Sequence, residues 1–173
     1  MNLFNLFQNV TTFVLDVDGV LTDGSLLVMP GGVMARRMNI KDGYALQLAV
    51  KKNYRVVIIS GGNAPEVKER LEKLGVHEVY MNTTDKPGIL RQLLETQHLP
   101  ATEILFMGDD IPDLAAMQLA GVRCCPQDAI TEIKSISQYI SPVKGGEGCV
   151  REVIEKVMKL RGDWSEDATI AAR

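Results

Sequence analysis

Three apolar segments, each followed directly by polar residues, constrain the fold of this chain more than any other feature. They cover residues 13–15, 55–59 and 104–107. Shorter apolar candidates lie at 79–80 and 122–124. The intervening stretches have helical periodicity, near residues 43–52, 65–74, 87–96, 112–120 and 150–160. Continuous apolar strands that alternate with helices are typical of a parallel sheet covered on both faces. The sequence therefore predicts an α/β fold with a doubly wound, mostly parallel sheet.

One segment, residues 26–39, interrupts this alternation. Two short apolar stretches there flank Pro30-Gly31-Gly32, which is the composition of a β-hairpin turn. The segment lies between the first strand and the first helix. We therefore expect a hairpin flap that projects over the sheet edge at which the first strand ends.

Length and composition indicate one globular domain over residues 1–173, with a terminal tail over about 161–173. A net charge of -3 argues against a nucleic-acid partner, and no apolar run is long enough to span a membrane. The apolar start at residues 3–7 lacks the features of a signal peptide. Three cysteines without metal-site spacing favour a reducing, cytoplasmic location.

Polar side chains that could take part in catalysis or bind a ligand follow each of the three main strands. Asp16 and Asp18 follow the first strand, and Ser60 follows the second. The third strand is followed by Asp109, Asp110 and Asp113. Lys86 lies between the second and third strands, at the start of a predicted helix. In a doubly wound sheet these strand ends converge on one crevice. Carboxylates around a hard cation such as Mg²⁺, with a lysine and a hydroxyl to hold phosphate, suit phosphoryl transfer.

These residues, in this order, resemble the four motifs of the haloacid dehalogenase superfamily. Within it, residues 18–24 (Asp-Gly-Val-Leu-Thr-Asp-Gly) and the glycine-rich residues 145–152 are similar to the 3-deoxy-D-manno-octulosonate 8-phosphate phosphatase family. The resemblance extends from about residue 13 to residue 160. Any one motif alone is weak evidence, whereas the four in order are specific.

The resemblance implies a role for each acid. Asp16 would attack phosphorus and form an aspartyl-phosphate, and Asp18 would serve as general acid and base. The side chains of Asp16 and Asp109, with the backbone carbonyl of Asp18, would bind Mg²⁺. Asp110 and Asp113 would hold metal-bound waters or orient the lysine.

The remaining site residues would bind the substrate, which the resemblance implies is 3-deoxy-D-manno-octulosonate 8-phosphate, an intermediate of lipopolysaccharide synthesis. Ser60, Gly61 and Lys86 would hold the phosphoryl oxygens. Arg70 would bind the sugar acid, in the same or an adjacent subunit's site. The exposed face of an amphipathic helix explains Arg70 equally well.

The spacing of the motifs also bears on how the site is closed. Roughly forty residues separate the first motif from Ser60, which leaves no room for a helical cap domain beside the hairpin. The resemblance implies a homotetramer in which the flap of one subunit closes the site of a neighbour. The exposed apolar residues of the hairpin would then lie in an interface.

Two positions depart from the family pattern. An arginine commonly follows Ser/Thr-Gly in the family, but Gly62 occupies that position, which leaves the sugar specificity open. Pro112 stands where asparagine is frequent before the last motif aspartate, and this change is expected only to stiffen the start of the helix. A phosphatase of a nine-carbon keto-sugar acid 9-phosphate is the nearest alternative. Two non-enzymatic alternatives are a phospho-receiver domain and a silent binding subunit. The order of the motifs argues against the receiver, and their completeness argues against the silent subunit.

Overall fold

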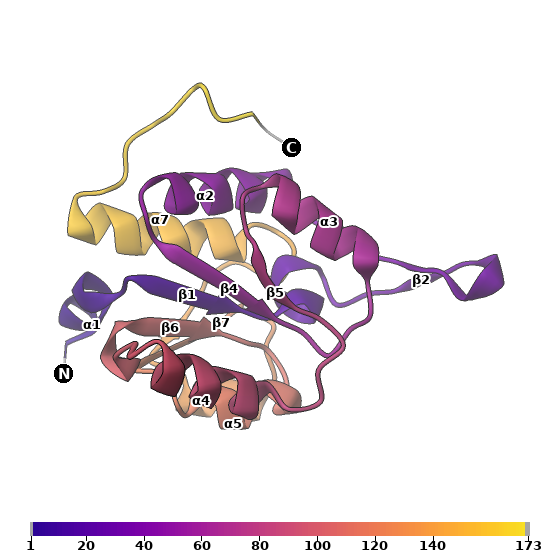
Figure 1. Cartoon of the computed structure of the whole chain (residues 1–173), viewed down its shortest axis with the longest axis horizontal. Coiled ribbons are helices and arrows are strands. Elements are labelled where there is room, and N and C mark those ends of the chain that lie inside the picture. The colour runs from indigo at the N-terminus through magenta and orange to yellow at the C-terminus, as the bar shows by residue number, and fades with distance from the viewer. Residues whose placement is uncertain (1, 172–173) are drawn as a thin grey trace.

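A computed structural model describes residues 2–171 of the chain (Figure 1). Its centre is a six-stranded sheet in the order β5-β4-β1-β6-β7-β8, and every neighbouring pair is parallel. The strands are β1 (Thr12–Leu15), β4 (Arg55–Ile59), β5 (Glu78–Tyr80), β6 (Ile104–Met107), β7 (Val122–Cys125) and β8 (Tyr139–Ile140). The predicted α/β class with a mostly parallel sheet is confirmed. The two-residue strand β8 was not predicted.

Helices cover both faces of this sheet (Figure 1). One face carries α2 (Ile40–Lys51), α3 (Pro65–Lys73) and α7 (Cys149–Arg161), and α1 (Leu3–Asn9) packs on the same core through Phe7. The opposite face carries α4 (Lys86–Thr96), α5 (Ile111–Met117) and the short α6 (Thr131–Ile136). The five predicted helices all form, whereas α1 and α6 were not predicted as helices.

The central strands are apolar on both sides because each face is buried. In β1, Phe13 and Leu15 belong to the core under α2 and α7, and Val14 belongs to the core over α4 and α5. All three side chains are at most 1% exposed. Successive side chains of a strand point to opposite faces, so a strand covered on both faces reads as a continuous apolar run.

The order of the strands places a crevice at the end of β1. From β1 the chain passes to β4 and β5 on one side, and then returns to β6, β7 and β8 on the other. The connections therefore diverge at the carboxyl ends of β1, β4 and β6. Ligands of open α/β sheets bind at such a switch point.

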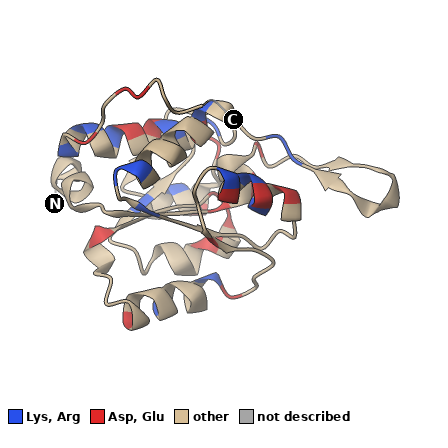
Figure 2. Cartoon of the chain, turned by 45° about the horizontal axis from the view of Figure 1, so that its top comes forward, with Lys and Arg blue, Asp and Glu red and all other residues tan. Residues whose placement is uncertain are grey.

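The predicted hairpin forms from β2 (Leu27–Val28) and β3 (Met34–Ala35), with a turn at Pro30–Gly32. It extends away from the body of the molecule (Figure 1). Figure 2 shows that its strands and tip are free of charged side chains, whereas its base carries basic ones. Leu27 and Val28 are 66% and 70% exposed. The hairpin is therefore an uncharged, solvent-exposed projection in the single chain.

The segment after α7 folds back over α2 rather than toward the crevice. Trp164 packs against Tyr44, and Asp167 forms an ion pair of 2.5 Å with Lys51. The last two residues of the predicted tail, and the first of the predicted domain, lie outside the described residues. Within residues 2–171, no helix combines the length and apolar character needed to cross a membrane.

Candidate active site

Asp16 lies directly beyond β1, at the switch point of the sheet. Its backbone N–H donates to the carbonyl of Met107, so the residue is held by the end of β6. Its side chain is only 8% exposed. The backbone ladder therefore fixes Asp16 while its carboxylate faces the crevice.

A tight turn follows Asp16 over Val17–Leu21, and Gly19 makes it possible. Gly19 has a φ of 89°, a conformation that L-residues with side chains rarely adopt. A Cβ at this position would also lie 2.0 Å from Oδ2 of Asp109. The glycine that follows the two aspartates is thus needed to let the carboxylate of Asp109 reach Asp16.

The glycine-rich loop of residues 145–148 packs against this same turn. A Cβ on Gly145 would meet the carbonyl oxygen of Gly19 at 1.9 Å, and one on Gly146 would meet the backbone nitrogen of Asp23 at 2.3 Å. The N–H of Gly146 donates to the carbonyl of Val20. The loop therefore supports the turn that carries Asp18, and its glycines allow backbone to touch backbone.

Lys86, the first residue of α4, links two acids in the crevice. Its Nζ lies 2.8 Å from Oδ1 of Asp16 and 2.7 Å from Oδ1 of Asp113. The lysine side chain is 5% exposed and that of Asp113 is 1% exposed. Burial lowers the pKa of Lys86, but the charges of Asp113 and Asp16 more than offset this, so the pKa is raised. Lys86 is a fixed cation at this point of the crevice.

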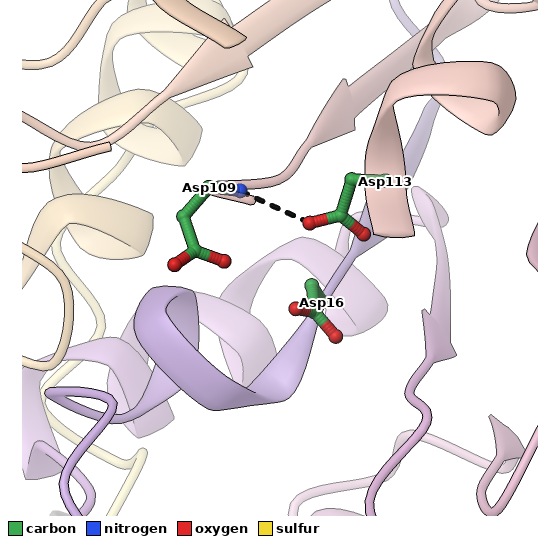
Figure 3. A group of neighbouring side chains, drawn as sticks. All are labelled: Asp16, Asp109 and Asp113. Carbon is green, nitrogen blue, oxygen red and sulfur yellow. Dashed lines mark hydrogen bonds between the residues drawn. The ribbon is translucent and has the colours of Figure 1, made fainter. Parts of the chain in front are cut away.

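Three carboxylates surround one common space at the ends of β1 and β6 (Figure 3). One oxygen from each of Asp16, Asp109 and Asp113 lies within 4.8 Å of the others. Both oxygens of Asp113 are engaged, one by Lys86 and the other by the backbone N–H of Asp109 at 3.0 Å. Oδ1 of Asp109 is buried without a hydrogen-bond partner. Asp16 and Asp109 are therefore the carboxylates available to a cation.

The pKa values of Asp16 and Asp109 also indicate that these two carboxylates are suited to bind a cation. Burial, and then the charge of Asp113, raise the pKa of Asp16 to about 7 despite Lys86. Burial, and then the charge of Asp16, raise the pKa of Asp109 to about 8. Both carboxylates lack positive charge for their degree of burial. An oxygen-preferring divalent cation would supply it.

The crevice continues from these acids to the end of β4. It has a volume of about 590 Å³, and its lining includes Asp18, Ser60, Gly61 and Asp110. Oγ of Ser60 accepts from the N–H of Gly62 at 3.1 Å. Asp110 is the N-cap of α5 and accepts from the N–H of Ile111. The structure thus brings together the predicted residues Asp16, Asp18, Ser60, Gly61, Lys86, Asp109, Asp110 and Asp113.

The side chain of Asp18 faces the flap. Its Oδ1 accepts from Nε of Arg36 at 2.6 Å, and its Oδ2 accepts from Nη2 at 3.2 Å. These hydrogen bonds raise the pKa of Arg36. The motif analysis did not single out Arg36. Its only signal was its position, directly after the returning strand of the hairpin.

Arg70 lies outside the acidic crevice in the single chain. It lines a neighbouring cavity of about 380 Å³ between the flap and α3, together with Arg36, Met34 and Glu66. Arg151, in the glycine-rich segment, pairs with Glu155 at 2.7 Å and packs on Trp164 instead. In the single chain neither arginine lines the acidic crevice, and the binding of the sugar acid by Arg70 stays a prediction.

Comparisons with known proteins bear on which family carries this site. A profile of haloacid dehalogenase-like hydrolases matches residues 39–121. The curated 3-deoxy-D-manno-octulosonate 8-phosphate phosphatase of Salmonella typhi is 31% identical over 159 residues, which cover 92% of this chain and 85% of that protein. The chain belongs to this family of haloacid dehalogenase-like hydrolases. The family resemblance predicted from the motifs is confirmed.

Solved structures of the family share the whole fold. A 3-deoxy-D-manno-octulosonate 8-phosphate phosphatase from Yersinia pestis superimposes with a TM-score of 0.89 at 28% identity, covering 92% of this chain and 86% of that one. The phosphatase from Moraxella catarrhalis, solved with a magnesium ion, a phosphate ion and KDO, has a TM-score of 0.88 at 28% identity. It covers 92% of each chain. The overall fold described above is therefore shared with these structures.

Proposed function

We propose that this chain is a Mg²⁺-dependent phosphatase that hydrolyses 3-deoxy-D-manno-octulosonate 8-phosphate to KDO and phosphate. The observation that carries the proposal is the buried group of Asp16, Lys86 and Asp109 at the switch point of the sheet. It combines an acid placed to attack, a fixed cation and an unpaired carboxylate. Family membership supports the same chemistry. The implied setting is lipopolysaccharide synthesis in the cytoplasm.

In the first half-reaction, an oxygen of Asp16 forms a bond to phosphorus while the bond from phosphorus to the sugar oxygen breaks. The leaving oxygen takes a proton from Asp18, and an aspartyl-phosphate remains. Lys86, Ser60 and the N–H groups near Gly61 neutralise and orient the phosphoryl oxygens. Asp113 keeps the ammonium of Lys86 in place, at 2.7 Å.

In the second half-reaction, a water oxygen attacks phosphorus and gives a proton to Asp18. The bond between phosphorus and Asp16 breaks, which restores the Asp16 carboxylate and releases phosphate. The geometry suits the dual role of Asp18, because it lies two residues after the nucleophile and lines the same crevice.

The carboxylates of Asp16 and Asp109, with the backbone carbonyl of Asp18, would hold Mg²⁺. The unpartnered Oδ1 of Asp109 and the raised pKa values of both acids fit a hard divalent cation at this place. When bound, Mg²⁺ supplies positive charge to the transferring phosphoryl group.

Mg²⁺ is expected to stabilise the fold more strongly at high pH. Between about pH 4 and pH 8 the folded, metal-free protein holds protons on Asp16 and Asp109 that the unfolded chain has released. Stability of the metal-free protein therefore falls as pH rises through this window. Mg²⁺ replaces those protons, so at a hundred times its Kd it should add about 2.7 kcal/mol at pH 8, or about 5–10 °C in Tm.

Thermal unfolding in EDTA and in Mg²⁺, at pH 6 and pH 8, measures this effect. The gain from Mg²⁺ should be smaller at pH 6 and should be lost in Asp109→Asn. A gain that is equal at both pH values, or that survives in Asp109→Asn, would show that the cation binds elsewhere.

Phosphate release from a small panel tests the substrate. We expect the eight-carbon keto-sugar acid phosphate to be hydrolysed in preference to its nine-carbon relative and to an aryl phosphate, and EDTA should stop all three. Preference for the nine-carbon acid would keep the mechanism and change the substrate, in line with the absent side chain at Gly62. No release from any ester would overturn the proposed phosphatase.

We also propose that the chain forms a homotetramer in which each flap closes a neighbour's site. The exposed apolar side chains of Leu27, Val28 and Met34 support this, because such a patch is costly to leave in water. Arg70 would then act from an adjacent subunit. Light scattering of the wild type and of Val28→Asp tests the proposal: the wild type should be a tetramer and the variant smaller, and a monomeric wild type would contradict it.

A further inference from the structure

We propose that Arg36 is a positioning residue that holds the carboxylate of Asp18 toward the leaving group of the substrate. This inference rests on the proposed phosphatase function. Nε and Nη2 of Arg36 donate to the two oxygens of Asp18 at 2.6 and 3.2 Å. A planar guanidinium that binds both oxygens of a carboxylate fixes its orientation as well as its position.

The guanidinium is itself fixed by the base of the flap. Nη1 of Arg36 donates to the carbonyl of Met34 at 3.1 Å, within the returning strand. Thr22 and Met38 form an antiparallel bridge that closes the base of the hairpin. The side chain of Arg36 is 6% exposed, whereas that of Asp18 is 36% exposed. The buried arginine is therefore the fixed partner, and the half-exposed aspartate is the one that it orients.

Gly62 leaves the space that this pair occupies. A Cβ at position 62 would lie 2.8 Å from Oδ2 of Asp18 and 3.0 Å from Nη2 of Arg36. Both distances are shorter than ordinary van der Waals contacts. The backbone after β4 therefore comes close to the pair of Arg36 and Asp18. A side chain at 62 would therefore require the ends of the Asp18 and Arg36 side chains to shift from their present positions.

The orientation of Asp18 matters most when the leaving group is poor. A sugar hydroxyl leaves as a basic alkoxide unless a proton is delivered to its oxygen, whereas an aryl oxygen leaves readily without one. To deliver that proton Asp18 must be in its acid form. Oδ1 then keeps the short hydrogen bond from Nε of Arg36 at 2.6 Å, and Oδ2, whose contact with Nη2 is longer at 3.2 Å, carries the proton that passes to the leaving oxygen. An aspartate free to change rotamer would deliver it less often. The loss of Arg36 should therefore slow alkyl phosphates far more than aryl phosphates.

Steady-state kinetics of Arg36→Ala on the sugar-acid phosphate and on an aryl phosphate test the proposal. We expect kcat to fall about 10²-fold on the sugar-acid phosphate and at most about 3-fold on the aryl phosphate, with little change in KM. Asp18→Asn should give the same pattern with a larger loss. Arg36→Lys keeps the positive charge but not the two parallel N–H donors of the guanidinium, and it should recover part of kcat.

Arg37→Ala is the matched control. Arg37 is the adjacent arginine, but its side chain is 67% exposed and pairs with Asp23 and Glu147. It should change neither substrate's kcat by more than about 2-fold. Equal losses on both substrates in Arg36→Ala, or a raised KM with unchanged kcat, would overturn the positioning role. An inactive wild type would instead overturn the proposed function.

A second measurement tests the arrangement without using activity. Gly62→Ala should lower Tm in the wild type and should lower it much less in Arg36→Ala, because the guanidinium is gone and Asp18, whose Oδ2 lies nearest to the new methyl group, is free to move aside. Additive shifts in Tm would show that Gly62 and Arg36 are not in contact. This thermal unfolding cycle remains informative even if Arg36→Ala is too slow to assay.

Discussion

Replacing Asp16 by asparagine is expected to abolish phosphate release, by at least about 10⁴-fold in kcat. The amide has the shape of the carboxylate but cannot form the aspartyl-phosphate on which both half-reactions depend. Folding should survive. Burial raises the pKa of Asp16 to about 7, so above that pH the metal-free wild type carries a charge that the amide does not. Asp16→Asn in EDTA at pH 8 should therefore have a Tm at least equal to that of the wild type.

Phosphate release and thermal unfolding of the same preparations measure both parts of this expectation. Asp85→Asn is the matched control, because Asp85 caps α4 next to Lys86 and accepts from the N–H of Gly88 at 2.8 Å. Asparagine caps helices as well as aspartate does. The control should therefore keep its activity. Turnover by a correctly folded Asp16→Asn protein would exclude the covalent mechanism.

The positions of the acids could be predicted from the sequence because strand ends and sheet topology determine them. Asp16 and Asp109 each follow a strand that is buried on both faces, and neighbouring parallel strands end at one edge of the sheet. The same logic placed Ser60 at the end of β4. Lys86 was predictable as the start of a helix, although only the structure shows it between Asp16 and Asp113.

The partner of Asp18 could not be predicted in this way. Arg36 reaches Asp18 through the path of the flap base, and periodicity does not encode the path of an irregular segment. Gly62 illustrates the same limit. In the sequence Gly62 is notable because it lacks the arginine of the family pattern. In the structure its lack of a side chain leaves room for Arg36 and Asp18 to pair. Arg70 lies on α3 in the cavity beside the flap, and its contact with substrate stays a prediction.

Replacing Lys86 by methionine is expected to have the second-largest effect, on both activity and stability. The phosphoryl group would lose its fixed cation, which should lower kcat about 10²–10³-fold. Asp16 and Asp113 would also lose their shared partner while they remain buried. Breaking a buried ion pair by removing one member typically costs about 3–5 kcal/mol.

The pH dependence of this loss distinguishes charge from packing. Lys86 lowers the pKa of Asp16, so without the ammonium this pKa rises further, and the folded variant holds a proton on Asp16 that the unfolded chain has released above about pH 4. Stability of the variant should therefore fall as pH rises, and its deficit against the wild type should be larger at pH 8 than at pH 6. Urea unfolding at both pH values measures this. Lys73→Met is the control, because Lys73 is exposed and its ion pair with Glu69, one turn away on α3, is exposed as well. Its effect should stay within about 0.5 kcal/mol. A deficit that is equal at both pH values would mean that Lys86 supports the site through its packing, and that the two aspartates do not need its charge to remain buried.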